Sequence, residues 1–170
     1  MAKGKTGTRI AKHVGDSQVE VTQLVLPNDT NQLGNLLGGR LMEWMDIAAA
    51  VSAQRHSNRV CVTAAVDNLV FYQPIKLGEV VTLRASVNRA FGSSMEVGVN
   101  VMSENQLTGE RKTSNTAYLT FVAVDENNRP TKIPRIVPGT SEEKRRYREA
   151  FVRRRLRLES RDRKRKKKEE

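Results

Sequence analysis

The chain has 170 residues, of which 38% are hydrophobic, and it carries a formal net charge of +11. This length suits one domain with its own core and short extensions. No segment approaches the roughly 20 consecutive apolar residues of a membrane helix, and the basic N-terminus lacks the apolar centre of a secretion signal. The single cysteine, Cys61, excludes an internal disulfide and a cysteine-based metal cluster. A reducing, cytoplasmic setting is the simplest interpretation.

The positive charge is unevenly distributed along the chain. Residues 141–170 contain 15 Lys and Arg against 7 Asp and Glu, whereas residues 1–140 contain 15 against 12. The body of the protein is therefore nearly balanced, and the C-terminal segment carries most of the excess. Such a tail either binds phosphates or is a solvated helix with a charged end. Because the body is nearly balanced, we do not expect nucleic acid as a partner.

The first part of the chain predicts a head, a strand, a loop and a helix. Residues 1–16 predict a flexible, basic head, and the alternation of apolar and polar residues over 17–26 predicts a strand. Turn-forming residues between 27 and 35 predict a loop. From residue 39 to 55 the apolar spacing becomes helical. One face of this helix holds Leu41, Met45, Ala48 and Ser52.

The central part of the chain predicts an antiparallel sheet. Four β-rich runs, at 60–72, 80–90, 94–104 and 112–125, are separated by short turns that contain Gly, Pro or Asn. Strands joined by short turns pair antiparallel, and the apolar face of such a sheet must be covered. The helix at 39–55 is the only long internal helix available to cover it. The predicted fold class is therefore α+β, a curved antiparallel sheet wrapped around one central helix.

The C-terminal residues predict a second helix. The pattern becomes helical from Thr140, and Ser141 can cap the helix with Glu142 and Glu143 in its first turn. The chain is thus expected to have a flexible head at 1–16, a main domain at 17–138, a C-terminal helix at 139–160 and a charged disordered tail at 161–170.

Several familiar catalytic and metal-binding patterns are absent from the sequence. It has no G-x-S-x-G elbow, P-loop or G-x-G-x-x-G, and no cluster of His and acidic residues that suits a metal. Of the two histidines, His13 lies in the head and His56 lies at the helix end, where an imidazole meets the last carbonyls. Cys61 falls in a strand and suits a small core position. Catalysis by a Ser–His or Cys–His pair is therefore not expected, and no metal site is predicted.

The segment that leads into the central helix holds the candidate chemistry. Gly38 and Gly39 precede the helix, so its first backbone N–H groups have no internal partners and a ligand can approach them closely. Such groups can polarise a carbonyl oxygen. Asp46 lies about two turns further along, and its neighbours one turn away, Met42 and Ala50, are apolar.

The acid and an upstream asparagine each have two interpretations. An ionised carboxylate among apolar neighbours is costly unless it is paired, solvated or shifted in pKa, so Asp46 is either functional or a capping group at one edge of the helix. Asn31, in the loop before the glycine pair, is either functional or a turn residue. Composition and spacing leave both alternatives open.

A resemblance to a known family covers most of the chain. The segment DTNQLGNLLGGRLMEWMDIAAAVSAQRH, with D-x-N-x-x-G-N-x-x-G-G before a helix that carries M-D-x-A, closely resembles the hotdog-fold acyl-coenzyme A thioesterases, the acyl-CoA hydrolase family. The resemblance continues through VCVTAAVDNLVFYQPIKLGEVV, GSSMEVGV, TFVAVDENNRP and VPGTSEEKRRY, over residues 17–158. It implies a hotdog fold, which the order of predicted elements indicates independently.

The resemblance also implies a reaction and roles for individual residues. The implied reaction is hydrolysis of fatty acyl-coenzyme A to free fatty acid and coenzyme A. Asp46 corresponds to the general base or nucleophile, Asn31 to the group that orients water or the thioester, and Gly38 and Gly39 to the helix end that polarises the carbonyl. One departure is Leu37, which stands where many relatives have a histidine or an aromatic residue.

The family further implies an oligomer and a substrate with three phosphates. Its sites lie at a dimer interface, so that one site draws Asn31 and Asp46 from opposite subunits, and dimers often assemble into hexamers. No separate cofactor is implied, because coenzyme A is part of the substrate. We expect its phosphates to contact the turn formed by Gly92, Ser93 and Ser94, and the C-terminal residues Arg153, Arg154 and Arg155.

Two other functions compete with the thioesterase. One is a non-catalytic protein that binds acyl-coenzyme A or, through the tail, another polyanion; such a binder does not need a carboxylate near a helix N-terminus. The other is a hotdog dehydratase, which relies on a catalytic histidine. His56 is the only histidine in the main domain and lies at the wrong end of the helix. The acyl chain length is not predicted, because the acyl tunnel is built from several strands and a partner subunit.

Overall fold

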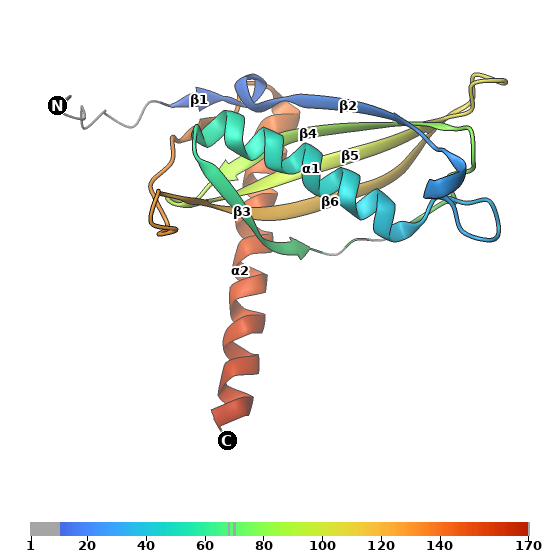
Figure 1. The fold of residues 1–170 in the computed structure, drawn as a ribbon. Coiled ribbons are helices and arrows are strands. Elements are labelled where there is room, and N and C mark those ends of the chain that lie inside the picture. The colour runs from blue at the N-terminus through green and yellow to red at the C-terminus, as the bar shows by residue number, and fades with distance from the viewer. Residues whose placement is uncertain (1–10, 68, 70, 170) are drawn as a thin grey trace.

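The computed structural model describes residues 11–67, 69 and 71–169. Its centre is a five-stranded antiparallel sheet, in the order β2-β4-β5-β6-β3, that curves around helix α1 (Figure 1). The main elements are β2 (Val19–Leu24), α1 (Gly38–Ser57), β3 (Val60–Asp67), β4 (Val80–Ala90), β5 (Ser94–Glu104), β6 (Arg111–Val124) and α2 (Ser141–Glu169). The α+β class and the hotdog arrangement predicted from the sequence are confirmed.

The core lies between α1 and the concave face of the sheet. Leu41, Met45, Ala48 and Ser52, the predicted inner face of the helix, are all buried. They face the alternating apolar residues of the strands, among them the fully buried Val99 and Phe121. The small side chains of α1 let its backbone approach the sheet closely, and burial of the apolar face supplies most of the stability of such a layer.

Helix α2 covers part of the opposite face of the sheet and then extends beyond it (Figure 1). It was predicted to end near residue 160 and to be followed by a disordered tail. That prediction is wrong, because the helix continues to Glu169. Residues 161–169 contain neither Gly nor Pro, and Lys, Arg and Glu are good helix formers. Cations near a helix C-terminus also interact favourably with its dipole.

The N-terminal cap of α2 is formed one residue earlier than predicted. The Thr140 hydroxyl accepts the Glu143 N–H at 3.1 Å, and the Glu143 carboxylate accepts the N–H groups of Thr140 and Gly139, at 3.1 and 2.6 Å. This reciprocal arrangement is a capping box, with a threonine three residues before a glutamate. Ser141 therefore begins the helix and does not cap it.

Part of the predicted flexible head is ordered. Residues 1–10 lie outside the described residues, but Lys12–His13 form β1, which pairs parallel with β7 (Ile136–Val137), and Val14–Ser17 form the short helix η1. Val14 and Ser17 are buried. The Ser17 hydroxyl accepts the Val87 N–H at 3.0 Å and donates to the Val14 carbonyl at 2.8 Å. The flexible head was predicted to reach residue 16. It is shorter than predicted, because the apolar side chain of Val14 is buried and orders this part of the chain.

His56 and Cys61 are both buried at the far end of α1, away from its N-terminus. The His56 Nε2 lies 3.0 Å from the Pro134 carbonyl oxygen, and burial lowers the pKa of the imidazole despite that hydrogen bond. Cys61 is a free cysteine in contact with Ser57, and burial raises the pKa of its thiol. Neither residue faces the glycine pair. This agrees with the sequence interpretation, which placed His56 at the end of the helix and Cys61 in the core. Among the described helices, none is long and apolar enough to cross a membrane.

Candidate active site

The loop before α1 is fixed to the start of the helix through Asp29. This residue lies at the end of helix η2 (Pro27–Asp29) and is largely buried. Its carboxylate accepts the Leu26 N–H at 3.0 Å and pairs with the Arg40 guanidinium at 3.0 Å, while its carbonyl accepts the Leu37 N–H at 2.8 Å. The loop and the first turn of α1 are therefore one connected unit.

Asn31 is both a turn residue and a free donor. Its side-chain oxygen accepts the N–H groups of Leu33 and Asn35, at 2.9 and 3.2 Å, which closes the turn. Its backbone N–H donates to the Asn35 carbonyl at 2.8 Å. The amide nitrogen has no partner among the residues that the structure describes, and the side chain is exposed. The fold therefore presents two N–H donors of Asn31 in a fixed orientation.

The first turn of α1 leaves its backbone N–H groups unused. Leu37 occupies the N-cap position but supplies no capping side chain, and the first intrahelical bond runs from the Leu41 N–H to the Leu37 carbonyl, at 3.0 Å. The N–H groups of Gly38, Gly39 and Arg40 precede that bond. A Cβ on Gly39 would have no heavy atom within 4 Å, so its backbone borders open space. The backbone at this helix end is therefore open to the approach of a ligand.

Asp46 is half-buried and is held by a residue that the sequence did not single out. The Thr63 hydroxyl of β3 donates to Oδ1 of Asp46 at 2.7 Å. The other carboxylate oxygen, Oδ2, stays available to accept a proton or to attack. Asp46 also lines a cavity of about 340 Å³, together with Gly39, Met45, Leu69 and Leu119. The carboxylate thus faces a mostly apolar space next to the open helix end.

A β-bulge aims Thr63 at Asp46. Thr63 pairs with Phe121 and Val66 pairs with Leu119, and both partners belong to the buried inner face of β6. Residues three apart in a regular strand point to opposite faces. Because of the irregularity between Thr63 and Ala65, both Thr63 and Val66 point to the inner face. Such bulges often reorient a side chain beside a functional site. No turn residue in VCVTAAVD marks this bulge, so the sequence pattern could not reveal it.

One protomer does not bring Asn31 and Asp46 together. Asn31 lines a second cavity, of about 290 Å³, with Gly38, Leu41 and Phe71. None of the residues around it lines the cavity of Asp46. The two neighbouring glycines divide between the cavities, Gly38 beside Asn31 and Gly39 beside Asp46. The chain thus has two separate cavities beside the helix N-terminus, which are called here the two half-sites.

Exposed apolar side chains of α1 and β3 lie beside Asp46. On α1 the neighbouring Met42 and Ile47 are 43% and 51% exposed, and Val66 of β3, which lines the same cavity as Asp46, is 44% exposed. β3 is also an edge strand of the sheet, with unpaired backbone groups along its outer side. Contiguous apolar surface next to an open strand edge is typical of a protein–protein interface.

Comparisons with known proteins agree with this architecture. The model of the thioesterase superfamily matches residues 33–110. The uncharacterized acyl-CoA thioester hydrolase YkhA of Bacillus subtilis is 45% identical over 136 residues, which cover 80% of this chain and 77% of that protein. This chain belongs to the thioesterase superfamily. It also matches mouse acyl-coenzyme A thioesterase 11 at 44% identity over 84% of its own length, but spans only 24% of that longer protein.

Two solved thioesterase structures are similar over nearly the whole chain. An apo-hexameric acyl-CoA thioesterase shares 40% identity and a TM-score of 0.86, with 89% of this chain and 97% of that chain covered. An acyl-CoA hydrolase from Staphylococcus aureus, solved with butyryl coenzyme A, coenzyme A and coenzyme A disulfide, shares 33% identity and a TM-score of 0.87, with 94% and 97% covered. That hydrolase has also been solved with alanine in place of an aspartate, an asparagine or a threonine.

The Gly92–Ser94 turn of this thioesterase-superfamily protein lies far from Gly39 within one protomer. β4 begins beside Leu24, next to the Asn31 loop, and the turn follows the other end of this 11-residue strand. A strand of that length spans about 36 Å. Gly92 has a φ of +96°, and the carbonyls of Gly92 and Ser93 accept N–H groups of Ile133 and Ala123. The turn is therefore tight and fixed to the neighbouring chain.

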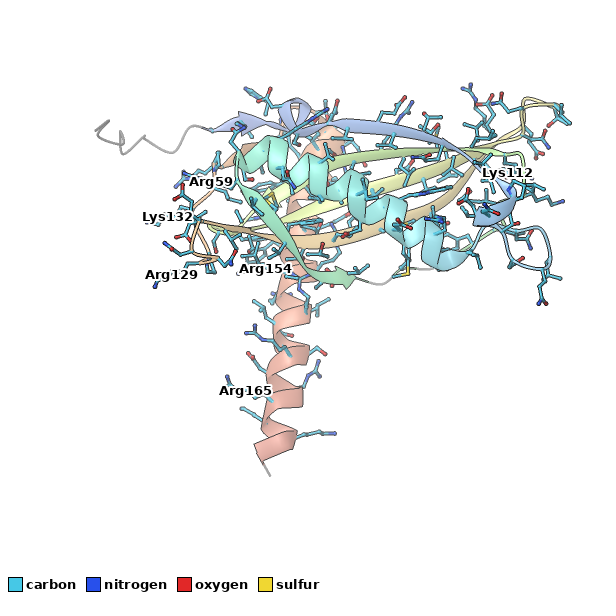
Figure 2. All side chains as sticks on the ribbon, in the orientation of Figure 1. Arg59, Lys112, Arg129, Lys132, Arg154 and Arg165 are labelled. Atoms are coloured by element: carbon cyan, nitrogen blue, oxygen red, sulfur yellow. The ribbon has the colours of Figure 1, made fainter. Side chains whose placement is uncertain are left out.

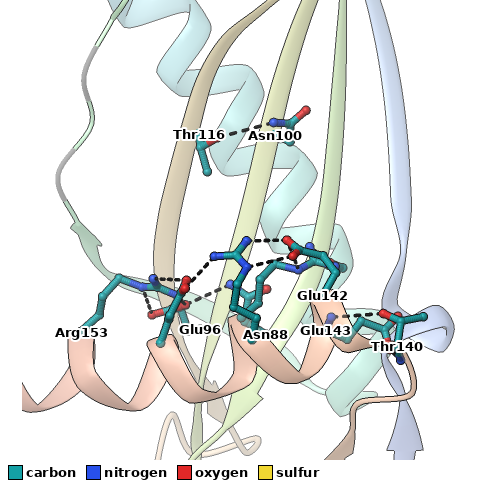
Figure 3. Close-up of polar contacts among 12 residues, drawn as sticks. Asn88, Glu96, Asn100, Thr116, Thr140, Glu142, Glu143 and Arg153 are labelled. Atoms are coloured by element: carbon teal, nitrogen blue, oxygen red, sulfur yellow. Dashed lines mark hydrogen bonds and ion pairs between the residues drawn. The ribbon is translucent and has the colours of Figure 1, made fainter.

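The three predicted arginines of α2 have different surroundings. Arg153 donates two hydrogen bonds to the Glu96 carboxylate, at 3.1 and 2.7 Å, and its guanidinium lies 3.6 Å from the centre of the Tyr118 ring. Glu96 is 1% exposed and also accepts from Asn88 at 3.0 Å (Figure 3). An unpaired carboxylate at that depth would be strongly destabilising. The Arg153 guanidinium is therefore bound to Glu96 and stabilises the packing of α2 on the sheet.

The other two arginines remain accessible. Arg154 stacks over the Phe91 ring at 4.6 Å, directly beside the Gly92–Ser94 turn. Figure 2 shows it at the same end of the molecule as Arg59, Arg129 and Lys132. Arg155 is exposed and lies 3.8 Å from Glu159. No group of three or more His, Cys, Asp or Glu that could hold a metal is found in the described part of the chain.

Proposed function

We propose that this protein hydrolyses acyl-coenzyme A to a free fatty acid and coenzyme A. The observation that carries the proposal is Asp46, which is hydrogen-bonded by Thr63 and lines an apolar cavity beside the open N-terminus of α1. A carboxylate with one oxygen held and the other free is suited to activate water or to attack a carbonyl carbon. The apolar wall suits the acyl chain.

The proposed reaction begins at the thioester carbonyl. Oδ2 of Asp46 either takes a proton from a water molecule that attacks the carbonyl carbon, or attacks that carbon itself to give an anhydride that water then cleaves. In both routes the bond from carbon to sulfur breaks, and the coenzyme A thiolate leaves and is protonated. The hydrogen bond from Thr63 to Oδ1 fixes the carboxylate orientation that either route requires.

Stabilisation of the oxyanion is assigned to two sets of N–H donors. Gly39, whose backbone N–H precedes the first helical hydrogen bond, lines the cavity of Asp46, and the Asn31 amide supplies a second donor, or orients the attacking water. Donors fixed in advance around a developing negative charge contribute strongly to acyl-transfer catalysis. Because Asn31 lines a separate cavity in its own protomer, we propose that it serves the Asp46 of a partner subunit.

The Staphylococcus aureus hydrolase supports these residue assignments. Its substituted asparagine lies 15 positions before the substituted aspartate, and its substituted threonine lies 17 positions after it. Asn31, Asp46 and Thr63 have the same spacing in this chain. Its hydrogen bond to Asp46 identifies Thr63, whereas the sequence patterns predicted only Asn31 and Asp46 as catalytic residues.

The proposed assembly follows from the exposed surface of β3 and α1. In a two-fold dimer, the same surface of both subunits lies in the interface. A dimer that buries this surface would therefore place Asp46 of each subunit against the other subunit. We further propose that three dimers assemble, as a trimer of dimers, which the hexameric relative supports. The location of this enzyme is proposed to be cytoplasmic, consistent with its single free cysteine.

The phosphates of coenzyme A are assigned to the Gly92–Ser94 turn and Arg154. The turn lies at the far end of β4 from Gly39, so we propose that it serves the site of another subunit. Arg155 is exposed and is retained as a second phosphate contact. Arg153, which was also predicted to contact the phosphates, is not assigned to them, because its guanidinium is bound to Glu96.

Replacement of Thr63 by alanine tests the carrying observation. We expect kcat to fall about tenfold, because the carboxylate loses its orienting hydrogen bond but keeps its charge. Thr63→Ser, which retains the hydroxyl, should keep most of the activity and is the matched control. Steady-state release of coenzyme A thiol measures both variants. Equal activity of Thr63→Ala and the unaltered protein would show that the contact has no part in the reaction.

A further inference from the structure

The segment that follows β3 forms part of the wall of both half-sites. Its described residues are Leu69 and residues 71–75, and it is called here the site strap. Leu69 lines the cavity of Asp46, whereas residues 71–75 line the cavity of Asn31. The Phe71 ring would lie 3.4 Å from a Cβ built on Gly38. The position of the strap therefore sets the shape of both cavities.

The strap has few backbone anchors. On one side, Asp67 is the last residue of β3 and pairs with Tyr118 of β6. On the other, the Ile75 carbonyl accepts the Leu36 N–H at 2.7 Å. Between these two points, the described residues of the strap make no backbone hydrogen bond. Segments of this kind open at low free energy, so their end contacts determine how well they are positioned.

The Asp67 end of the strap carries an ion pair to α2. Arg157 Nη1 donates a hydrogen bond to Asp67 Oδ2, and the two side chains are 22% and 19% exposed. Asp67 reaches the outer face because the bulge at Thr63 leaves Val66 pointing inward and the next residue pointing outward. Burial raises the pKa of the Asp67 carboxyl, and the neighbouring Arg157 opposes that shift. The carboxylate thus depends on its arginine partner.

The polar contacts of Arg145, Arg146 and Arg153 on α2 are made with β4, with β5 or within the helix, and not with the described residues of the strap. Arg146 contacts Ser86 of β4 at 3.5 Å, and Arg153 binds Glu96 of β5. Arg145 pairs only within the helix, with Glu142 and Glu149 at 2.5 and 2.6 Å. Among the described residues, Arg157 is the side chain of α2 that hydrogen-bonds Asp67, the last residue of β3 before the strap, while Tyr72 of the strap lines a cavity with Leu156 and Arg157.

We propose that the Asp67–Arg157 ion pair is a positioning contact that fixes the site strap, and so makes α2 a structural support of the thioester site. This inference rests on the proposed function for its kinetic consequence, but not for its structural one. Neither residue touches the reacting atoms. Asp46, Thr63 and the helix N-terminus lie outside the strap, so loss of the pair should impair substrate binding more than the chemical step.

The structural test is hydrogen–deuterium exchange on the full-length protein. In Asp67→Asn and Arg157→Met, peptides that cover residues 69–75 should exchange at least about fivefold faster, because the strap opens more often. Arg145→Met is the matched control and should leave that exchange unchanged. Glu96→Gln weakens another contact of α2 and should accelerate exchange in the helix but not in the strap. Equal acceleration of the strap in Glu96→Gln would overturn the proposal, since any loosening of α2 would then suffice.

The kinetic test separates positioning from catalysis. Both single variants should raise KM for acyl-coenzyme A about tenfold and change kcat less than about threefold. The charge exchange Asp67→Arg with Arg157→Asp should bring KM back toward that of the unaltered protein, as expected for two residues that act through each other. Unchanged KM and unchanged exchange in folded single variants would contradict the inference. If the unaltered protein hydrolyses no acyl-coenzyme A, the proposed function fails, while the exchange result still decides the role of the ion pair.

Discussion

Asp46→Asn is expected to lower kcat for acyl-coenzyme A hydrolysis by at least about 100-fold. An amide at this position is nearly isosteric, and its oxygen can still accept the hydroxyl of Thr63, which lies 2.7 Å from the carboxylate. It can neither take a proton from water at neutral pH nor attack the thioester. The fold and the melting temperature should therefore be preserved while the chemistry is lost.

Glu43→Gln provides the matched control for Asp46→Asn. Glu43 lies one turn earlier on α1, is exposed, pairs with Arg40 at 2.7 Å and borders the same cavity as Asp46. The substitution removes the same charge from the same helix, and should change kcat less than about threefold, because exposed pairs contribute little. Retention of more than a tenth of the activity in Asp46→Asn, or an equal loss in Glu43→Gln, would exclude Asp46 as the catalytic carboxylate.

Mixing two inactive variants should restore activity if each site draws on two subunits. Asn31→Ala and Asp46→Ala should each be nearly inactive alone. In a mixed two-fold dimer, one site has both residues intact and the other has neither. With random pairing at equal amounts, half of the dimers are mixed, so the mixture should recover about a quarter of the unaltered activity.

The reason for this expectation is the separation of the two half-sites within one protomer, on either side of Gly38 and Gly39. Subunit exchange must be verified independently, for example by native mass spectrometry of differently labelled chains. If exchange is complete and activity does not return, Asn31 and Asp46 of one site come from the same chain, and the proposed dimer is wrong.

Local patterns predicted most of the fold. The strands at 80–90 and 94–104 have the expected bounds, because alternating residues and short turns specify them directly. The inner face of α1 was predicted from helical spacing. The ordered part of the N-terminal head was not predicted. Burial of Val14 depends on tertiary contacts, which the neighbouring residues in the sequence do not reveal.

The candidate site was only partly predictable for the same reason. Asn31, Asp46 and the glycine pair stand out in one continuous segment. Thr63 reaches Asp46 only through a bulge and a contact between residues 17 positions apart. Arg153 binds Glu96, which lies 57 positions away in the sequence. The sequence therefore could not show that this arginine is unavailable to bind phosphate. Contacts across elements, rather than residue types, decide such roles.

The most direct test of a thioesterase is the product analysis of the unaltered protein with acyl-coenzyme A substrates from short to long chain. For at least one chain length, each acyl-coenzyme A consumed should yield one coenzyme A thiol and one free fatty acid, and Asp46→Asn should yield almost none. Tight binding of acyl-coenzyme A by the unaltered protein, without release of thiol at any chain length, would contradict hydrolysis and identify a non-catalytic binding protein.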